Sequence, residues 1–567
     1  MTGPITRHRD IDSLETAAAW PGADRATVVT LAARYVAAGL DAQAHRYFQH
    51  MSETSGDQPL PLALAGFFQA RAGGDVKAAL AKLDAAAAAD LGLPQYLRGL
   101  ALAALPPDRE RAARAVADLE FVLAVRDQFP PLLIRPVYQG LASAYEVLGE
   151  DGRAAEFSER SGVPRGSAPL FGTDWFNAAD GFRMTTPALA RPEPGVVVAR
   201  GYDFGDFAFI RTSEGVIAID AGTAEHRVRA ALTDAGFPPG TAVTHVILTH
   251  AHFDHAGGIG ALLGPGTTVI VQAAFPAEQE RQRGNHIPFR NFTGETGGGG
   301  QPVSPDQLVA EPTALTVGGT DLMLYPVTGG ETPDALMIHL PASGLLFTGD
   351  VMMPYLGAPF FAEGSAEGLL ETLRFIRDLR PRALIQGHPP LTSLFSVDAI
   401  EGLEAALTGL REHVLDGIGR GLTLSAILDA ACLPDALRDH PLAVVPYLVT
   451  RDNFTARLYH QRTGYWQADG QGLAPVPATA RAAALDLLAG GGEEPFVRAA
   501  GVLTGQGDHA LALEIIEPGL LRYPSSAALA RLRQDTLRRL AELHQQLDPF
   551  RFLIYSELAG LEIGPVR

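Results

Sequence analysis

Three stretches with different hydrophobic patterns follow one another along the chain. In residues 1–165, small and apolar residues recur at helical spacing, and the segments 66–86 and 138–160 share one arrangement. In both segments a helix-type pattern ends at a Gly-Asp or Glu-Asp-Gly turn and an Ala-rich helix-type pattern follows, and residues 35–49 hold a weaker copy. Small residues at facing positions let two helices approach closely, and each pair has to bury its open face on the next pair. The first stretch is therefore predicted to be a domain of helical hairpins.

The second stretch, from about residue 172 to about residue 400, consists of short apolar runs separated by turn signals, with helix-type segments such as 367–379 between some of them. The runs lie at residues 196–200, 207–212, 215–222, 244–250, 267–272, 322–327, 335–340, 345–350 and 382–388. Strands with interspersed helices are typical of an α/β or α+β layered domain. The glycine run 297–300 is expected to form a loop at the edge of an active-site cleft.

The third stretch is helical again, and residues 497–544 repeat the helix–turn–helix pattern of the N-terminal region. A chain of 567 residues exceeds what one hydrophobic core supports, so we expect several domains. The changes of pattern place them at residues 1–165, 166–400 and 401–567. The predicted fold class is α+β and multidomain, with a layered sheet domain flanked by all-α regions.

Charge and composition narrow the range of partners and locations. The chain has 45 Lys and Arg residues against 64 Asp and Glu residues, a net charge of -19, which disfavours nucleic acid or an anionic membrane as a partner. The N-terminal residues lack the apolar run of a secretory signal, and we expect no membrane span, since no stretch of about 18 apolar residues occurs. The single cysteine, Cys432, excludes an internal disulfide. We therefore expect a cytoplasmic protein.

The segment THAHFDHAGG (249–258) directly follows an apolar strand-type run and carries the strongest chemical signal. Three imidazoles and a carboxylate within six residues are costly at a strand end unless a cation gathers them. His250 and His252 alternate on an extended chain, so they point to the same side and can share a metal ion. Asp254 and His255, after the turn, can reach a second ion about 3.5–4 Å from the first.

The order His-x-His-x-Asp-His after a strand resembles the signature of the metallo-β-lactamase superfamily. The resemblance implies an αββα sandwich over about residues 172–400, with the metal site at the edge between two sheets. It also implies that Asp220 orients a ligand histidine. Three further ligands are expected at the ends of later strands: Glu331, where the family usually has histidine, Asp350 at the position of the bridging carboxylate, and His388 as the last ligand.

Taken alone, each downstream residue is a weak signal, because Glu331 is equally compatible with a solvated loop and Asp350 with a turn. By the resemblance, one ion is held by His250, His252 and Glu331, and the other by Asp254, His255 and His388, with Asp350 between them. Three carboxylates and four imidazoles favour two divalent ions, with Zn²⁺ expected and iron or manganese as alternatives.

Within the superfamily, glutamate at the position of Glu331 is a feature of the alkyl sulfatases. Residues 451–473 resemble the segment that follows the catalytic domain in those enzymes, where a helical dimerisation domain carries a similar aromatic pattern. The matching residues are Tyr459, Gly464, Tyr465, Trp466 and Asp469. The resemblance therefore implies a homodimer that forms through the C-terminal helical domain. The N-terminal helices resemble tetratricopeptide-type packing, for which a scaffold or dimer contact and peptide recognition are both open.

The segment DVMMPYLGAPFFAEG (350–364) departs from the alkyl-sulfatase pattern, which has histidines and an arginine after the bridging carboxylate. Substrate contacts are instead expected from Asn285 and Arg290 in another loop and from Tyr355. The candidates for the proton donor are Tyr355 and His286, and Asp254 is expected to act in catalysis as well as in metal binding. The apolar side chains of the segment either line the site for an organic substrate tail or pack in the core; they are Met352, Met353, Tyr355, Phe360 and Phe361.

The function predicted from these residues is hydrolysis of an ester-type bond in a small molecule with an apolar part, by water activated between two metal ions. A sulfate ester follows from the resemblance, and a carboxylic ester, thioester or lactone follows from the missing histidines and arginine. Iron-dependent redox chemistry on the same scaffold is a second alternative. It is disfavoured by His252, since the diiron relatives usually have glutamate there. A non-catalytic scaffold protein is the third alternative, and a full ligand set argues against it.

Overall fold

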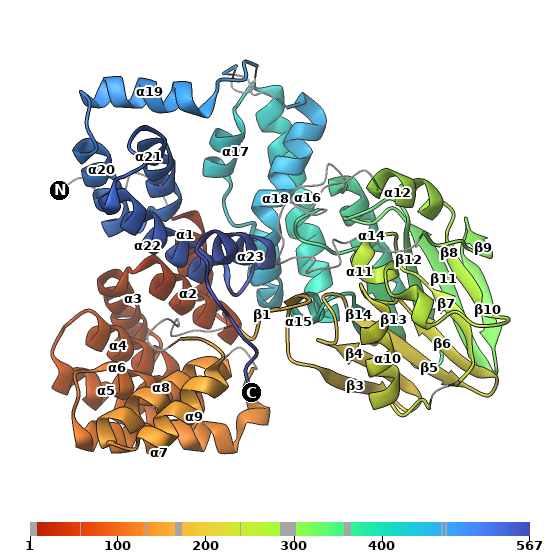
Figure 1. Cartoon of the computed structure of the whole chain (residues 1–567), viewed down its shortest axis with the longest axis horizontal. Coiled ribbons are helices and arrows are strands. Elements are labelled where there is room, and N and C mark those ends of the chain that lie inside the picture. Colours follow the sequence, from red (N-terminus) through yellow and green to blue (C-terminus); the bar gives the residue numbers. More distant parts are fainter. Residues whose placement is uncertain are drawn as a thin grey trace. The chain divides into compact units, whose positions relative to one another are not determined.

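The computed structural model describes residues 8–56, 58–130, 133–164, 173–238, 240–283, 302–356, 364–465, 469–470 and 473–567. The chain divides into two units: the first combines Met1–Trp175 with Ala474–Arg567, and the second is Phe176–Leu473 (Figure 1). The units run differently from the three expected segments, because the C-terminal helices pack with the N-terminal ones. The predicted domain limits at 165 and 400 therefore do not coincide with the limits of the two units.

The first unit is helical throughout its described part. Its N-terminal helices are α1 (Arg9–Ala18), α2 (Arg25–Ala38), α3 (Asp41–Thr54), α4 (Pro59–Arg71), α5 (Val76–Ala89), α6 (Leu93–Ala104), α7 (Arg109–Ala124), the 3-10 turn η1 (Arg126–Gln128), α8 (Ile134–Leu148) and α9 (Asp151–Ser161). Its C-terminal helices are α19 (Ala478–Ala489), α20 (Glu494–Gly505), α21 (His509–Arg522), α22 (Ala527–His544) and α23 (Pro549–Leu558).

The turn between α4 and α5 shows why this sequence folds into helical hairpins. Asp75 caps α5 by accepting hydrogen bonds from the backbone N–H groups of Lys77 and Ala78. Within α4, a Cβ at Gly66 would lie 2.8 Å from the backbone oxygen of Ala79, so only glycine permits this close approach of the two helices. The predicted helical pairs thus lie where the Gly-Asp pattern placed them, while a true repeat architecture stays a prediction.

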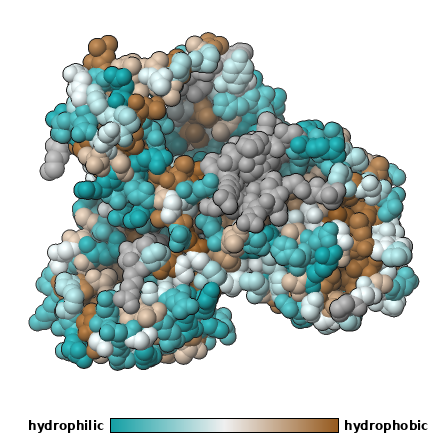
Figure 2. Space-filling model, in the orientation of Figure 1, coloured by the Kyte–Doolittle hydropathy of each residue, from teal (hydrophilic) through white to brown (hydrophobic). Residues whose placement is uncertain are grey.

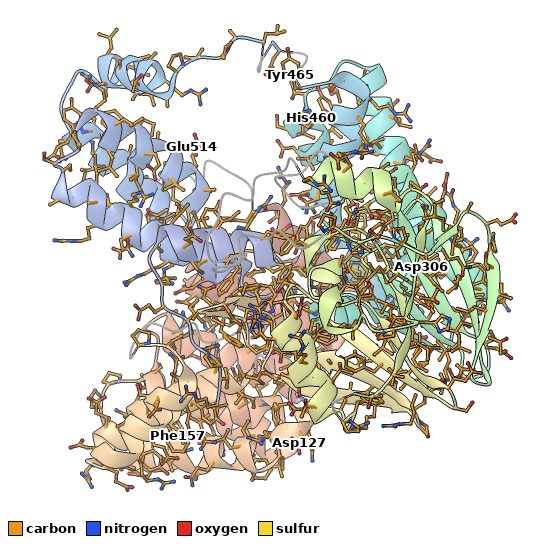
Figure 3. All side chains as sticks on the ribbon, turned by 45° about the vertical axis from the view of Figure 1, so that its right-hand side comes forward. Asp127, Phe157, Asp306, His460, Tyr465 and Glu514 are labelled. Atoms are coloured by element: carbon orange, nitrogen blue, oxygen red, sulfur yellow. The ribbon has the colours of Figure 1, made fainter. Side chains whose placement is uncertain are left out.

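Aromatic contacts and one buried arginine hold the first unit together. Phe157 of α9, labelled in Figure 3, stacks on Tyr145 of α8 with ring centroids 5.7 Å apart. Arg135 is 2% exposed and donates hydrogen bonds to the backbone oxygens of Thr173 (2.7 Å) and Gly564 (3.1 Å). Because Gly564 lies near the C-terminus, Arg135 ties the two parts of this discontinuous unit to each other.

One helix of the first unit carries exposed leucines. Leu487 and Leu488, at the C-terminal end of α19, are 84% and 85% exposed. Brown, hydrophobic surface is visible at the upper left of Figure 2, where α19 ends in Figure 1. Single exposed leucines are ordinary, but two adjacent and almost fully exposed ones mark a surface that can serve as a contact.

The second unit contains two larger sheets and a short hairpin of β1 (Phe176–Ala178) and β2 (Gly181–Arg183). The first sheet runs in the order β3 (Ala188–Glu193), β4 (Val196–Arg200), β5 (Phe207–Thr212), β6 (Gly215–Ile219), β7 (Val243–Ile247), β8 (Thr268–Gln272), β9 (Gln307–Val309). The second runs in the order β10 (Thr313–Val317), β11 (Thr320–Val327), β12 (Ala335–Leu340), β13 (Leu345–Gly349), β14 (Ala383–Gln386). Strands β6 to β9 pair in parallel, as do β13 and β14, and the remaining neighbours pair antiparallel.

Helices cover the outer faces of the two sheets. They are α10 (Glu225–Asp234), α11 (Phe253–Ala256), η3 (Ile259–Ala261) and α12 (Phe275–Gln282) by the first sheet, and α14 (Ala366–Leu379), α15 (Pro389–Leu394), α16 (Val397–Gly419), α17 (Leu424–Ala430), η5 (Asp435–Arg438), η6 (Pro441–Ala443) and α18 (Val444–Thr463) after the second. Phe375 of α14 packs on Tyr325 of β11 with ring centroids 4.9 Å apart. The α14 helix is in turn tied to α16 by Arg374 and Glu404, 2.8 Å apart. Residues 401–473 therefore belong with the sheets.

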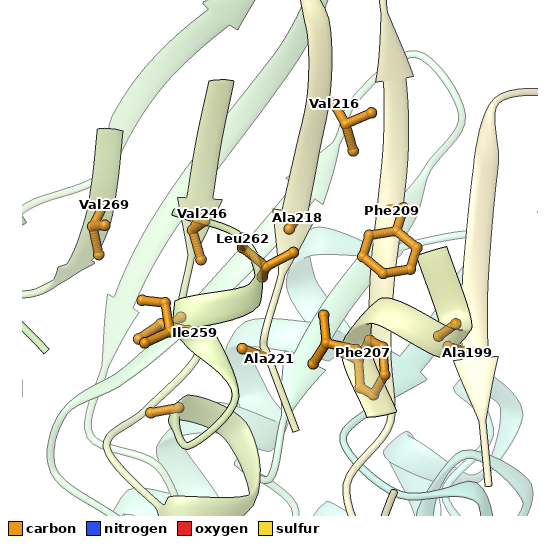
Figure 4. Packing of buried hydrophobic residues seen from close by; sticks show 14 of the residues in the cluster. Ala199, Phe207, Phe209, Val216, Ala218, Ala221, Val246, Ile259, Leu262 and Val269 are labelled. Atoms are coloured by element: carbon orange, nitrogen blue, oxygen red, sulfur yellow. The ribbon is translucent and has the colours of Figure 1, made fainter. Parts of the chain in front are cut away.

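The period-two alternation of the strands separates two cores. On β5, Phe207 and Phe209 point to the helix-covered face and pack near Val246 and Ile259 (Figure 4). Ala208 and Ile210 of the same strand point between the sheets, where they join the core shared by the two sheets. Helix, sheet, sheet and helix thus form four layers, which confirms the predicted αββα fold class.

A short edge strand completes the first sheet. Asp306, labelled in Figure 3, precedes β9, and its carboxylate accepts a hydrogen bond of 2.8 Å from the backbone N–H of Val269 in β8. Its own backbone N–H donates to the oxygen of Val269 at 2.9 Å.

Within the described ranges, no helix is both long and apolar enough to cross a bilayer.

Candidate metal centre

The polar residues of the site lie where four strands end. Asp220 follows β6, His250 follows β7, Asp350 follows β13, and His388 follows β14. Because β6 pairs in parallel with β7, and β13 with β14, these residues lie at the same edge of each sheet. Glu331 comes from the loop between β11 and β12. The carboxyl ends of parallel strands are a common location for sites in α/β folds.

The seven residues expected as ligands come together at this edge and are all buried. His250, His252 and Glu331 form one group whose ligand atoms lie within 4.8 Å of one another. A second group of the same kind combines Asp254, His255 and His388. The third combines His250, His255 and Asp350, so that Asp350 joins residues of both groups.

Short distances connect imidazole nitrogens to carboxylate oxygens inside these groups. In the first, Nε2 of His250 lies 3.1 Å, and Nδ1 of His252 3.4 Å, from Oε2 of Glu331. In the second, Nε2 of His388 lies 2.9 Å from Oδ2 of Asp350. The same His388 nitrogen is 3.4 Å from Oδ2 of Asp254. These separations are those of donor atoms that face a common point.

Neighbouring groups fix the tautomer of three of the imidazoles. His255 donates from Nδ1 to Oδ2 of Asp220 at 2.9 Å, and His388 donates from Nδ1 to the backbone oxygen of Phe204 at 3.0 Å. The Thr249 hydroxyl donates to Asp220 at 2.8 Å, so it accepts from Nδ1 of His250, which lies 3.1 Å away. Since each Nδ1 carries the ring proton, each Nε2 can present a lone pair to the site.

The electrostatics of the site favour positive charge. Burial alone disfavours protonation of His388, but the carboxylates of Asp350 and Asp254 outweigh it and raise the pKa of His388 to about 10. The same balance of burial against neighbouring carboxylates raises the pKa of His255 well above its ordinary value. Burial would raise the pKa of Asp350, but the imidazoles of His388 and His255 hold it well below its usual range. The buried carboxylates of the site therefore favour the presence of a cation.

Several buried donor atoms have no hydrogen-bond partner among the described residues. Among the seven expected ligands they are Nε2 of His250, Nε2 of His255, Oε2 of Glu331 and Oδ1 of Asp350, and beside the site they include both carboxylate oxygens of Asp206 and of Asp334. Leaving such atoms unpaired is costly. Imidazole nitrogens and carboxylate oxygens are the donors that borderline divalent ions prefer. The residues present thus fit a divalent metal.

The remaining expected residues divide into two sets. The catalytic candidate His286, the substrate contacts Asn285 and Arg290, the glycine run 297–300, Phe360, Phe361 and Trp466 lie outside the described residues. Met352, Met353 and Tyr355 are 0%, 4% and 7% exposed, so these three side chains pack in the core rather than forming an open wall. For Met352 and Met353 this burial corresponds to the second of the two expectations, namely that they pack in the core and do not line the site. The catalytic role of Tyr355 stays a prediction.

Two further acidic residues beside the site escaped the sequence analysis. Asp206 is buried, which raises the pKa of its carboxyl to about 7 although the Arg200 guanidinium opposes the shift. Asp334 is fully buried, and its pKa is raised because burial outweighs the stabilising charge of His250. The signal that marks Asp206 is a run of glycines and aspartates, GYDFGD (201–206), between two strand-type runs. Asp334, three residues after Glu331, has no comparable signal.

Comparisons with known proteins agree with this geometry. The family described as the metallo-beta-lactamase superfamily matches residues 200–388, which contain all seven expected ligands. The linear primary-alkylsulfatase of a Pseudomonas species is 21% identical over 398 residues, which is 63% of this chain and 74% of that protein. The hydroxyacylglutathione hydrolase of Cereibacter sphaeroides is 29% identical over 147 residues, 26% of this chain and 48% of that protein.

A solved structure shows the same fold over a longer span. The stereoselective inverting sec-alkylsulfatase from Pseudomonas sp. superposes with a TM-score of 0.53 at 18% sequence identity, covering 66% of each chain. The (R)-specific secondary-alkylsulfatase of Pseudomonas sp. is 22% identical over 394 residues, 61% of this chain and 58% of that protein. Residues 200–388 are thus a metallo-β-lactamase superfamily domain, in a chain whose homologues include alkylsulfatases.

Proposed function

We propose that this chain is a hydrolase that uses two divalent metal ions to cleave an ester-type bond in a small molecule with an apolar part. The observation that carries the proposal is the pair of three-residue groups joined by Asp350, with the Nε2 atoms of His250, His255 and His388 turned toward the carboxylates. Two metal ions of this kind act as Lewis acids, lower the pKa of water and offset charge that develops in the transition state.

The residues of this chain have distinct parts in the proposal. His250, His252 and Glu331 would hold one ion, Asp254, His255 and His388 the other, and Asp350 both. Asp220 orients His255 directly and orients His250 through the Thr249 hydroxyl, which it holds at 2.8 Å. The mixed nitrogen and oxygen donors suit zinc, and iron or manganese are the alternatives.

A sulfate ester is the first substrate class that we propose. Two alkylsulfatases are among the chain's relatives, and Glu331 lies in the same group as His250 and His252, as expected for that branch. Residues 351–364 contain no histidine or arginine, so other residues would have to bind the sulfate group.

A thioester is the second substrate class, and a specific observation favours it. The hydroxyacylglutathione hydrolase relative, whose name describes a thioester hydrolase, shows the higher identity, although it matches only 147 residues. An acyl thioester has no sulfate group and therefore has no need of the missing histidines and arginine.

The test is a substrate panel run on purified protein stripped of metal and reloaded with zinc, manganese or iron. The panel contains primary and secondary alkyl sulfates, acylglutathione thioesters, carboxylic esters and lactones. We expect metal-dependent turnover of one class, and loss of that turnover in His252→Ala and Glu331→Ala. Asp321→Asn, on an exposed position of β11, is the matched control that keeps its activity. Equal activity with and without metal would contradict the proposal. Two bound ions without turnover of any substrate class in the panel would also contradict it.

We also infer that the chain forms a homodimer through its C-terminal helices. The exposed leucines of α19, Leu487 and Leu488, supply apolar surface that a second copy of the chain can cover. Light scattering coupled to size exclusion measures the mass directly. We expect a dimer for the native chain and a monomer for Leu487→Glu with Leu488→Glu. A native monomer at micromolar concentration would contradict the inference.

A further inference from the structure

The backbone of the turn 203–206, between β4 and β5, contacts the second ligand group, which consists of Asp254, His255 and His388. The carbonyl of Phe204 accepts the hydrogen bond of 3.0 Å from Nδ1 of His388, and the Phe204 ring lies 4.7 Å from the His388 ring. The backbone N–H of Asp206 donates to the oxygen of Gly387, at 2.6 Å. The segment that carries His388 is therefore held by two backbone groups of this turn.

Glycine at position 205 allows the same turn to approach a second ligand. A Cβ at Gly205 would lie 2.5 Å from the backbone oxygen of Asp254 and 3.5 Å from Cε1 of His255. No side chain fits at this distance. The turn consequently lies against the backbone or ring of all three residues of the second group.

A buried ion pair fixes the turn. Asp203 is 1% exposed, and its carboxylate accepts hydrogen bonds from the backbone N–H groups of Phe204 (2.7 Å) and Thr223 (2.8 Å) and from the Thr223 hydroxyl (2.7 Å). Nη1 of Arg227 lies 2.6 Å from the same carboxylate. The Arg227 side chain is held from its other edge by Asp180, 2.9 Å from its Nε. The charges are paired and their hydrogen bonds are made, as a buried pair requires.

The placement of the Phe204 carbonyl decides which nitrogen of His388 faces the site. A carbonyl oxygen only accepts hydrogen bonds, so the His388 nitrogen beside it has to be the one that carries hydrogen. Nε2 is left to face Oδ2 of Asp350 and Oδ2 of Asp254, at 2.9 and 3.4 Å. Because Asp203 holds the N–H of Phe204, a shift of Asp203 moves the carbonyl and releases the ring.

We propose that the Asp203–Arg227 pair is a positioning device for one of the two metal ions, the one held by Asp254, His255 and His388. This inference rests on the proposed function in one respect, namely that two ions bind. In the other group, His250 is oriented through the Thr249 hydroxyl, which Asp220 holds. Weakening the Asp203–Arg227 pair therefore lowers the affinity of one ion and leaves the other in place. Loss of such an outer partner lowers metal affinity by about 10–100-fold.

The experiment compares metal binding in Asp203→Asn, Arg227→Lys and the wild-type full chain. Asp203→Asn keeps the shape of the side chain but removes its charge, and Arg227→Lys keeps a charge but cannot span both Asp180 and Asp203. Arg229→Lys is the matched control, because Arg229 lies two residues along α10 and pairs only at the surface with Glu225. Zinc content is measured during a chelator titration, and cobalt-loaded samples report the ligand field of each site.

The expected wild-type result is two bound equivalents, both retained in Arg229→Lys. In Asp203→Asn and Arg227→Lys one equivalent should keep its affinity while the other is lost at about 10–100-fold lower chelator concentration. The cobalt spectrum should lose the contribution of one site only. Equal weakening of both equivalents, or no change in either, would overturn the positioning role.

Thermal unfolding of the metal-free variants identifies a loss of folding. If Asp203→Asn does not fold, Arg227→Lys decides the question by the same titration. A wild type that binds fewer than two ions would overturn this inference together with the two-metal proposal. A wild type that binds two ions but hydrolyses no ester would overturn the proposed reaction alone, and the variants would still decide the role of Asp203.

Discussion

Asp220 accepts a hydrogen bond of 2.9 Å from Nδ1 of His255 while its own backbone has a φ of 60°, in the left-handed region. Non-glycine residues rarely adopt this conformation, and holding one there costs about 1–3 kcal/mol. The carboxylate also accepts from the backbone N–H of Thr249, at 2.7 Å. The end of β6 thus has an unfavourable backbone conformation, and this conformation places the Asp220 carboxylate where it accepts the hydrogen bond of His255.

Asp220→Asn tests the importance of that acceptor. Asparagine keeps the size of the side chain, but it has one acceptor oxygen instead of two and loses the charge that fixes His255. We expect metal affinity to fall by about 10–100-fold, measured by competition with a chelator. Asp321→Asn on β11 serves as the surface control. Unchanged affinity in Asp220→Asn would show that His255 is oriented by its packing alone.

Gly387→Ala should displace proposed metal ligands, because the added Cβ would overlap with them. A Cβ at this position would lie 2.1 Å from Oδ1 of Asp350 and 2.6 Å from Cε1 of His255, so two of the proposed ligands have to move. We expect loss of metal, and a fall in hydrolytic activity of about 10–100-fold. In contrast, Gly409→Ala on the exposed side of α16 meets no atom within 4 Å and should stabilise its helix by about 0.5–1 kcal/mol. Full metal content in Gly387→Ala would contradict the arrangement.

His509 makes the first unit sensitive to acid. Burial, with smaller effects of Arg539 and His8, lowers the pKa of His509 to about 4. Because this folded-state pKa is below the unfolded value of about 6.5, the stabilisation is present above about pH 6.5 and is lost as the pH falls toward 4. His509→Phe should flatten this part of the pH dependence of the unfolding free energy, as measured by urea denaturation. Parallel curves for the two proteins between about pH 7 and about pH 4 would refute this role.

Arg135 is expected to be important for the stability of the first unit. Replacement by methionine removes the donor to the backbone oxygens of Thr173, Trp175 and Gly564. Thr173 and Trp175 are buried, and each buried oxygen left unpaired costs about 1–3 kcal/mol. Arg25→Met is the control, because Arg25 is 55% exposed, lies 3.7 Å from Asp90, and contributes at most about 1 kcal/mol. Equal unfolding midpoints in urea for the two variants would contradict the assignment.

The sequence predicted most reliably what short-range patterns encode. The apolar runs at 196–200 and 207–212 correspond to β4 and β5, and the histidine motif lies at the end of β7, where it was expected. The strand β3 was missed because none of its residues is buried and exposure does not alternate along it, so that its pairing with β4 determines it. The strand β9 has only three residues, too few to show a period.

Features that depend on distant contacts or on the backbone could not be predicted. The acceptor of the His388 hydrogen bond is the carbonyl of Phe204, which is 184 residues away and has no sequence signature. Asp203 and Arg227 look like ordinary surface charges in the sequence until folding buries them together. The joining of both chain ends in one unit depends in the same way on contacts such as that of Arg135 with Gly564.

The discontinuity of the first unit has a consequence for how the chain is made. Its helices up to Trp175 emerge from the ribosome before the sheet unit, but the residues that complete this unit, Ala474–Arg567, emerge after the sheet unit. Synthesis proceeds at about 5–20 residues per second, so the early helices wait many seconds for their partners. The sheet unit, Phe176–Leu473, is continuous and can complete its fold during that interval. A ribosome stalled once Leu473 has left the exit tunnel, but before α22 is made, should therefore display the sheet unit already folded and N-terminal helices that still lack α22.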